Sequence, residues 1–222
     1  MGNESRFRPA AAIFDMDGLM LDTERPALDL WARAGKSLGI EISAEMVIST
    51  LGIDDDGMRP IFLNRFGSDF PYDTLLEKLK ELTFEEFNEG IAHKKGLSTM
   101  LDRLSTLCIP MAVATSTNRE KAAWKLKQAG IYDRFGIIVC GDEIKNGKPA
   151  PDIFLLAAEK LGKSPQECVG FEDSAAGLKA LYSAGIPSVF IKDMVEPPDD
   201  VLATVWRRYD NLADAVEIFW KN

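Results

Sequence analysis

The sequence predicts an α/β protein, with a doubly wound parallel sheet as its core and an inserted helical bundle as a cap domain. Two observations predict the sheet: short, nearly continuous apolar runs, and helical segments that alternate with them from Gly96 onward. The insertion is predicted because the first apolar run, 10–14, is separated from the others by a long tract without a strand pattern. A chain of 222 residues with 46% apolar residues can bury a core of this size.

The first strand is predicted over 10–14, an apolar run that follows Pro9 and is too short for a helix. The ten residues after it, 15–24, contain four acids in the order DMDGLMLDTE. A calcium-binding EF-hand loop is a poor fit, because it needs its glycine at the sixth position and a helix before it, whereas Gly18 comes fourth after a strand. Ligands of open α/β sheets bind beyond the carboxyl ends of the strands, so a site is expected here.

The tract between this strand and Gly96 is predicted to be a bundle of about four short helices. Gly39 ends the first of them, whose apolar face is expected to contain Leu28, Trp31, Ala32, Gly35 and Leu38. Residues 44–91 continue with apolar segments that glycine and proline interrupt. We therefore expect 1–18 and 94–222 to form the α/β catalytic core, and 19–93 to form the helical cap.

Helices and strands alternate in the remainder of the chain. Further strands are predicted at 110–115, 136–140, 167–171, 187–191 and 203–206. Helices are predicted at 97–106, 119–129, 151–161, 174–184 and 211–219. Because parallel strands end at the same edge of a sheet, polar residues that follow different strands are expected to meet there.

Bulk composition excludes several classes of protein. The net charge of −9 repels phosphate backbones, so we expect no nucleic-acid partner. No run approaches 18 apolar residues, and Asp15 interrupts the first one, which argues against a membrane span and a secretory signal. The three cysteines, Cys108, Cys140 and Cys168, have no CxxC spacing and are expected to be reduced. These features are typical of a cytoplasmic protein without a membrane partner, and we expect a monomer.

Hydroxyl groups follow the second predicted strand. Thr117 and Glu120 have the spacing of a capping box, which would begin the next helix. Backbone N–H groups at this helix start, together with the Thr115 hydroxyl, could bind an anion. Helix capping explains Thr117 and Asn118 but does not explain Thr115, so a capping role and an anion-binding role both stay open at this point.

A lysine and two acids follow later strands. Lys148 precedes Pro149 and Pro151, which immobilise the backbone beside a cation. Glu172 and Asp173 follow the strand at 167–171. Together with the acids of 15–24 they would repel one another by roughly 1 kcal/mol or more per close pair. Mg²⁺ would remove this repulsion, since it binds carboxylates, waters and substrate phosphates.

In these residues the sequence resembles the haloacid dehalogenase superfamily, in its branch of small-molecule phosphatases and β-phosphoglucomutase-like enzymes. The motifs that carry the resemblance occur in the family's order: Asp15-x-Asp17-Gly18-x-x-x-Asp22-Thr23-Glu24, then Thr115 after an apolar strand, then Lys148-Pro-x-Pro-Asp152, then Gly-Phe-Glu172-Asp173-Ser-x-x-Gly177. The likeness extends over essentially the whole chain, and the inserted helices are similar to the family's helical cap.

The resemblance implies an Mg²⁺-dependent phosphatase that hydrolyses a small phosphorylated metabolite, such as a sugar phosphate, through an aspartyl-phosphate. Asp15 would be the nucleophile, and Asp17 would protonate the leaving alkoxide and then activate water. Thr115 and Lys148 would hold the transferring oxygens. The implied magnesium ligands are Asp15, Asp17 (through its carbonyl) and Asp173, with Glu172 as a further ligand or as a partner through water. The implied substrate-binding residues are Asp22, Glu24, Thr115, Ser116, Asn118 and Lys148.

Two other functions stay open. A β-phosphoglucomutase-like sugar phosphomutase shares the motifs, but its cap carries a histidine and an arginine where this chain has Ala27 and the acidic stretch 54–56. The orientation of the basic cap residues Arg59, Arg65, Lys78 and Lys80 does not follow from the sequence. A non-catalytic phospho-acceptor switch would need neither Asp17 nor a cap. A dehalogenase would lack Asp17, and a Ser-His-Asp hydrolase would have to use His93, which lies in a polar stretch.

Overall fold

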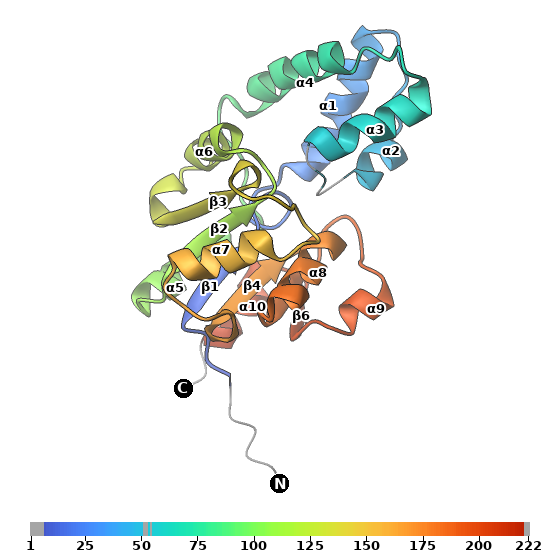
Figure 1. The fold of residues 1–222 in the computed structure, drawn as a ribbon. Coiled ribbons are helices and arrows are strands. Elements are labelled where there is room, and N and C mark those ends of the chain that lie inside the picture. Colours follow the sequence, from blue (N-terminus) through green and yellow to red (C-terminus); the bar gives the residue numbers. More distant parts are fainter. Residues whose placement is uncertain (1–6, 51–52, 54, 220–222) are drawn as a thin grey trace.

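The computed structural model describes residues 7–50, 53 and 55–219, with the side chains at 55 and 56 excepted (Figure 1). An α/β core carries four inserted helices, which stand beyond one end of its sheet at the top of the view. The predicted fold class is therefore confirmed. Within the described residues, no helix combines the length and the apolar composition that crossing a bilayer would require.

The core contains a six-stranded sheet in the order β3-β2-β1-β4-β5-β6, and every neighbouring pair is parallel. The strands are β1 (Ala11–Phe14), β2 (Met111–Thr115), β3 (Ile137–Cys140), β4 (Cys168–Glu172), β5 (Ser188–Ile191) and β6 (Arg207–Tyr209). Phe14 pairs with Val113 of β2 on one side and with Phe171 of β4 on the other. The chain order thus reverses at β1, and the carboxyl end of β1 is the topological switch point at which ligands bind in such sheets.

Helices cover both faces of the sheet, since alternate residues of β1 enter different cores. Ala11 and Ile13 pack with α7 (Asp152–Lys160) and α8 (Ala175–Ala184), whereas Ala12 and Phe14 pack with α5 (Leu97–Thr106) and α6 (Arg119–Gln128). The remaining helices of the core are α9 (Asp199–Leu202) and α10 (Leu212–Ala215). Single 3-10 turns lie at Tyr132–Arg134, Gly141–Glu143, Pro165–Glu167 and Val216–Phe219.

The inserted helices are α1 (Glu24–Ser37), α2 (Ala44–Ser49), α3 (Asp55–Phe66) and α4 (Tyr72–Phe87). Their core forms around Phe62, which is fully buried and stacks on Trp31 at a centroid distance of 5.0 Å. One residue of the predicted apolar face was wrong: Ala32 is exposed, and α1 instead buries Leu30, Trp31, Ala34 and Gly35.

Two linkers join these helices to the core, and they run side by side. The backbone N–H of Asp22 donates to the carbonyl of Ala92 at 2.9 Å, and that of Lys94 donates to Met20 at 2.9 Å. His93 lies in the return linker, where it is exposed and Nε2 donates to the carbonyl of Ala129 at 2.7 Å. The chain thus enters and leaves the inserted helices at one narrow place, directly after the acidic loop.

The end of the chain differs from the prediction. Residues 203–206 are not a strand, because they follow the short helix α9, whose residues Val201 and Leu202 pack against Leu178 of α8. Pairing begins only at Trp206, whose N–H donates to the carbonyl of Ser188, and β6 follows. The predicted helix at 211–219 is divided into α10 and a 3-10 turn. Packing on α8 outweighs the strand-like composition of this stretch.

Candidate active site

A cavity of about 500 Å³ lies between the carboxyl ends of the core strands and the inserted helices. From the core, Asp15, Thr115 and Lys148 line it, together with the helix start that contains Ser116 and Asn118. The sequence had placed these five residues at strand ends, and the structure brings them to one cavity.

Asp15 and Lys148 form the floor of this cavity. Lys148 Nζ donates to Asp15 Oδ1 at 2.5 Å and to Glu172 Oε1 at 2.6 Å, with side-chain exposures of 3% for Lys148 and 1% for Glu172. Burial raises the pKa of Asp15 to about 7, although the neighbouring ammonium acts to lower it. Burial acts to lower the pKa of Lys148, but the two carboxylates raise it. The ammonium is therefore held between two buried acids and stays charged.

The second oxygen of Glu172 is also occupied. Oε2 accepts hydrogen bonds from the backbone N–H groups of Asp173 and Ser174, and from the Ser174 hydroxyl. A side chain on Gly177 would not fit, since its Cβ would lie 1.7 Å from Glu172 Oε1. Glu172 is thus fixed in place and committed to Lys148 and to the start of α8.

Asp17 lies beside this group and accepts three side-chain hydrogen bonds, from Thr23 at 2.7 Å, Thr117 at 2.8 Å and Lys125 at 2.6 Å. Burial acts to raise its pKa, but the Lys125 ammonium and the three hydrogen bonds lower it below its usual range. Asp17 is therefore ionised in this arrangement.

The predicted capping box is wrong. Asn118, not Thr117, caps α6, because its side chain accepts from the backbone N–H of Lys121 at 3.0 Å. The Thr117 hydroxyl is thereby available to donate to Asp17. Thr115 is 2% exposed and its hydroxyl oxygen accepts from the N–H of Thr117, so it orders this turn from within the cavity wall.

Sequence reasoning also missed two lysines that line the cavity, Lys121 and Lys125. They lie four residues apart on α6 and so share a helix face with its N-cap. This spacing, directly after the Thr115 turn, is the pattern in the sequence from which the two lysines could have been predicted.

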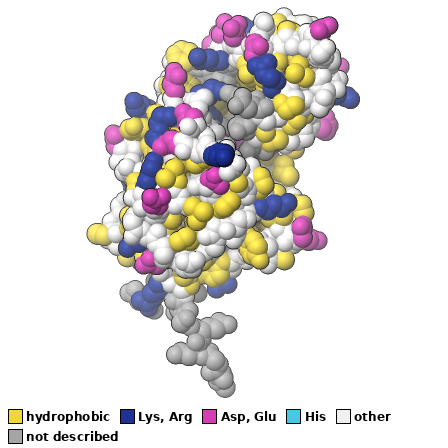
Figure 2. All heavy atoms as spheres, in the orientation of Figure 1, with side chains coloured by type: hydrophobic (Ala, Val, Ile, Leu, Met, Phe, Trp, Pro, Cys, Tyr) yellow, Lys and Arg dark blue, Asp and Glu magenta, His cyan; other side chains and the backbone are white. Residues whose placement is uncertain are grey.

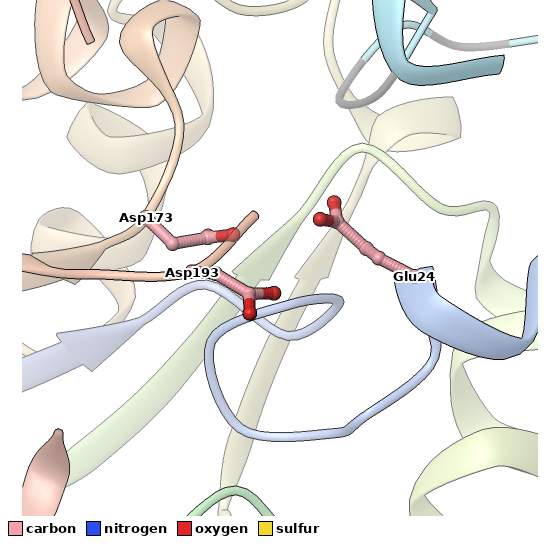
Figure 3. A group of neighbouring side chains, drawn as sticks. All are labelled: Glu24, Asp173 and Asp193. Atoms are coloured by element: carbon pink, nitrogen blue, oxygen red, sulfur yellow. The ribbon is translucent and has the colours of Figure 1, made fainter. Parts of the chain in front are cut away.

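A second acidic group lies next to Asp15. Glu24, Asp173 and Asp193 each place a carboxylate oxygen within 4.8 Å of the others, and Figure 3 shows the three side chains converging from α1 and from the loops after β4 and β5. Asp193 was not predicted, although it follows a predicted strand just as the other acids do. The turn at Gly18 (φ +81°) allows this approach, since a Cβ there would lie 2.3 Å from Asp173 Oδ2.

These acids are electrostatically strained when no cation compensates them. Burial, together with the charges of Asp193 and Asp15, raises the pKa of Glu24 to about 8. Burial likewise raises the pKa of Asp173 well above its usual range, and Glu172 adds to the effect. The raised pKa values of Glu24 and Asp173 fit a neighbouring hard divalent cation, which would favour their ionised forms.

Asp22 does not reach the cavity. Its carboxylate forms ion pairs with Arg25 at 3.0 Å and with Lys94 at 3.8 Å, beside the linkers. The structure therefore separates Asp22 from the other predicted substrate-binding residues and places it at the junction with the inserted helices.

The inserted helices supply an apolar wall to the cavity. Among the described residues, this wall consists of Ala27, Trp31, Val47, Thr50, Ile53 and Met58. Thr23 and Glu24, at the start of α1, line the cavity beside it, so the charged side chain described on this side is an acid. The prediction for the acidic stretch 54–56 concerns position 54 and the side chains of 55 and 56, which lie outside the described part of the structure.

Comparisons with known proteins agree with this geometry. The family model of the haloacid dehalogenase-like hydrolases matches residues 9–185. The chain is 31% identical over 180 residues to the phosphorylated carbohydrates phosphatase of Thermotoga maritima, covering 81% of this chain and 83% of the relative. It is 31% identical over 193 residues to the beta-phosphoglucomutase of Bacillus subtilis, covering 81% of each. The solved beta-phosphoglucomutase of Clostridium difficile has a TM-score of 0.77 and 25% identity, over 95% of this chain and 97% of that one.

Proposed function

Since the chain belongs to the haloacid dehalogenase-like hydrolases and is a phosphoric monoester hydrolase, we propose that it hydrolyses a small phosphorylated metabolite through an aspartyl-phosphate on Asp15. The observation that carries the proposal is the pair of Asp15 and Lys148 on the cavity floor, with Asp17 two residues further along the same loop. The similarity of this chain to a phosphatase of phosphorylated carbohydrates favours a sugar phosphate as the substrate.

In the first step, a carboxylate oxygen of Asp15 attacks phosphorus, the bond from phosphorus to the ester oxygen breaks, and Asp17 in its protonated form gives its proton to the leaving oxygen. The Lys148 ammonium and the Thr115 turn offset the charge of the transferring oxygens. In the second step, water attacks the acyl phosphate and regenerates Asp15, and Asp17 takes a proton from that water. The lowered pKa of Asp17 favours the ionised form that the second step requires, whereas the first step requires Asp17 to take up a proton and its pair with Lys125 to open.

Mg²⁺ would add positive charge beside the transferring phosphoryl group. We propose Asp15, the carbonyl of Asp17 and Asp173 as the residues that hold it. Glu172 belonged to the expected ligand set, but both its oxygens are already engaged. We assign Glu172 the role of positioning Lys148.

We further propose that 19–93 forms the cap domain, and that 1–18 and 94–222 form the catalytic core. The hydrogen-bonded linkers at 20–22 and 92–94 are close to these boundaries and support them. We propose a cytoplasmic monomer without nucleic-acid partners. Acidic and basic side chains are interspersed over the face shown in Figure 2, which is unlike a surface built for a phosphate backbone.

Removal of divalent cations is expected to abolish phosphate release, because the carboxylates of Asp15, Asp173 and Glu24 would then lie near one another without a divalent cation to balance their charges. The measurement is release of inorganic phosphate from a panel of phosphorylated sugars, with EDTA and again after excess Mg²⁺ is added. Recovery with Mg²⁺ is the control for irreversible unfolding. Undiminished turnover in EDTA would refute the magnesium assignment.

A sugar phosphomutase is the second candidate, since a mutase and a phosphatase form the same aspartyl-phosphate. A mutase must hold the distal phosphate of a bisphosphate, for which a basic cap residue is suited. None of the described cap residues that line the cavity is basic. Arg59 pairs with Asp73, and Lys78 pairs with Glu81 at 2.8 Å, while Arg65 and Lys80 are exposed outside the lining. The lack of a basic side chain among the described cap residues of the lining therefore favours hydrolysis.

With β-glucose 1-phosphate and a trace of the 1,6-bisphosphate, we expect inorganic phosphate to form faster than glucose 6-phosphate. The two products are followed separately in the same incubation. Isomerisation far faster than phosphate release would establish the mutase instead. Steady release over many turnovers also distinguishes an enzyme from a phospho-acceptor switch, which yields at most one equivalent.

A further inference from the structure

Asp193 is a buried acid of this region that has no role in the proposed reaction. It lies two residues after β5, and its side chain is 2% exposed. Oδ1 accepts from Lys94 Nζ at 2.5 Å and from Arg25 Nη2 at 2.9 Å. Oδ2 is buried and has no hydrogen-bond partner among the described residues. A buried carboxylate oxygen without a partner is costly, so this atom calls for a ligand.

A divalent cation would satisfy this atom and the neighbouring groups together, because the groups on this side of Asp193 are acids. Carboxylate oxygens of Glu24, Asp173 and Asp193 lie within 4.8 Å of one another. In Figure 3 the three side chains come from separate elements and point toward a common space. The backbone of Gly18 borders this space, and a Cβ at that position would collide with both Asp173 and Glu24. The loop thus keeps clear the place where the acids meet.

We propose that Asp193 is a cation-facing carboxylate, which forms a divalent-cation site together with Glu24 and Asp173. In an octahedral Mg²⁺ site with bonds of about 2.0–2.1 Å, neighbouring ligand atoms lie roughly 3 Å apart and opposite ones roughly 4.2 Å apart, so the three acids would move toward one another to enclose the ion. Asp173 also belongs to the proposed magnesium set, so the inference rests on the proposed function. It adds two acids, Glu24 and Asp193, to the groups that determine the affinity for that ion.

An ion-pair role at the linkers would explain the contacts of only one carboxylate oxygen of Asp193. Arg25 and Lys94 both contact Oδ1, which leaves Oδ2 directed elsewhere. A carboxylate that serves only these two bases would be expected to share its two oxygens between them. The two roles predict opposite behaviour when Arg25 is changed, and this difference makes the proposal testable.

The experiment measures Mg²⁺ binding to the full chain by calorimetry, without substrate. Asp193→Asn is expected to weaken binding at least about ten-fold, as loss of a supporting ligand does. Arg25→Gln removes a cation from the same carboxylate but keeps Oδ2, and should bind Mg²⁺ as tightly as the wild type or more tightly. Circular dichroism checks that both variants are folded.

Mg²⁺ affinity of the wild-type value in Asp193→Asn would overturn the proposal. Equal weakening of Mg²⁺ binding in Asp193→Asn and Arg25→Gln would also overturn it, because it would show that Asp193 acts only through its ion pairs at the linkers. If Asp193→Asn does not fold, Glu24→Gln tests the same site from a partly exposed position, and unchanged affinity there refutes it equally. Phosphate release by the wild type tests the proposed function separately. A chain that binds Mg²⁺ through Asp193 but hydrolyses no phosphomonoester would refute the function and leave this site standing.

Discussion

Asp15→Asn is expected to lower the rate of phosphate release by about 10⁴-fold or more, because an amide cannot form the acyl phosphate. The fold should survive the change. Asp15 is buried with a raised pKa, and Lys148 keeps its second partner, Glu172, at 2.6 Å. The variant therefore replaces an ion that burial disfavours with a neutral side chain of the same shape.

The measurement is steady-state phosphate release at saturating substrate and Mg²⁺, with thermal unfolding in parallel. Asp29→Asn is a matched control, since it makes the same chemical change on α1 at a side chain that is 70% exposed and paired with Arg33. The control should keep wild-type kinetics. A folded Asp15→Asn protein with wild-type turnover would remove the nucleophile assignment.

Lys148→Met is expected to reduce both activity and stability. Removing the ammonium leaves Asp15 and Glu172 as buried acids without their cation, and breaking a buried pair in this way costs about 3–5 kcal/mol. For a chain of this length, the melting temperature should fall by roughly 10 °C. Turnover should fall by about 10²–10³-fold, because a positive charge is lost beside the transferring oxygens.

The pH dependence of this deficit has a definite sign. The pKa of Asp15 is already raised in the folded wild type. The Lys148 ammonium acts to lower this pKa, so removing the ammonium raises it further. A carboxyl whose pKa is higher in the folded state favours folding at low pH, and this contribution is lost as the pH rises through the folded pKa. The instability of Lys148→Met should therefore be smaller near about pH 5 than near about pH 8.

A double-mutant cycle with Glu172→Gln tests the pairing itself. The double variant should be less destabilised than the sum of the single changes, since it removes both members of the Lys148–Glu172 pair. Strict additivity would contradict the view that Glu172 positions Lys148. Wild-type melting of Lys148→Met would contradict the buried ion pair altogether.

The fold class and most of the site could be predicted from the sequence because both depend on local pattern. Apolar runs and glycine-ended helices define the alternating elements, and the helix at 97–106 has the predicted limits. In a parallel sheet, strand ends share one edge, so Asp15, Thr115, Lys148 and Asp173 had to come near one another once the strands were recognised.

Only the tertiary structure decided how these groups pair. Asp17 contacts Lys125 across 108 positions of sequence, and Lys94 contacts Asp193 across 99. Such pairings depend on how α6 and the linkers are placed against the loops, and no local periodicity encodes that placement. For the same reason, Glu172 resembled a metal ligand in the sequence, whereas in the folded chain its oxygens are held by Lys148 and the start of α8. Local composition determined which chemical groups reach the sheet edge, and packing between distant segments determined which of them face a cation and which face each other.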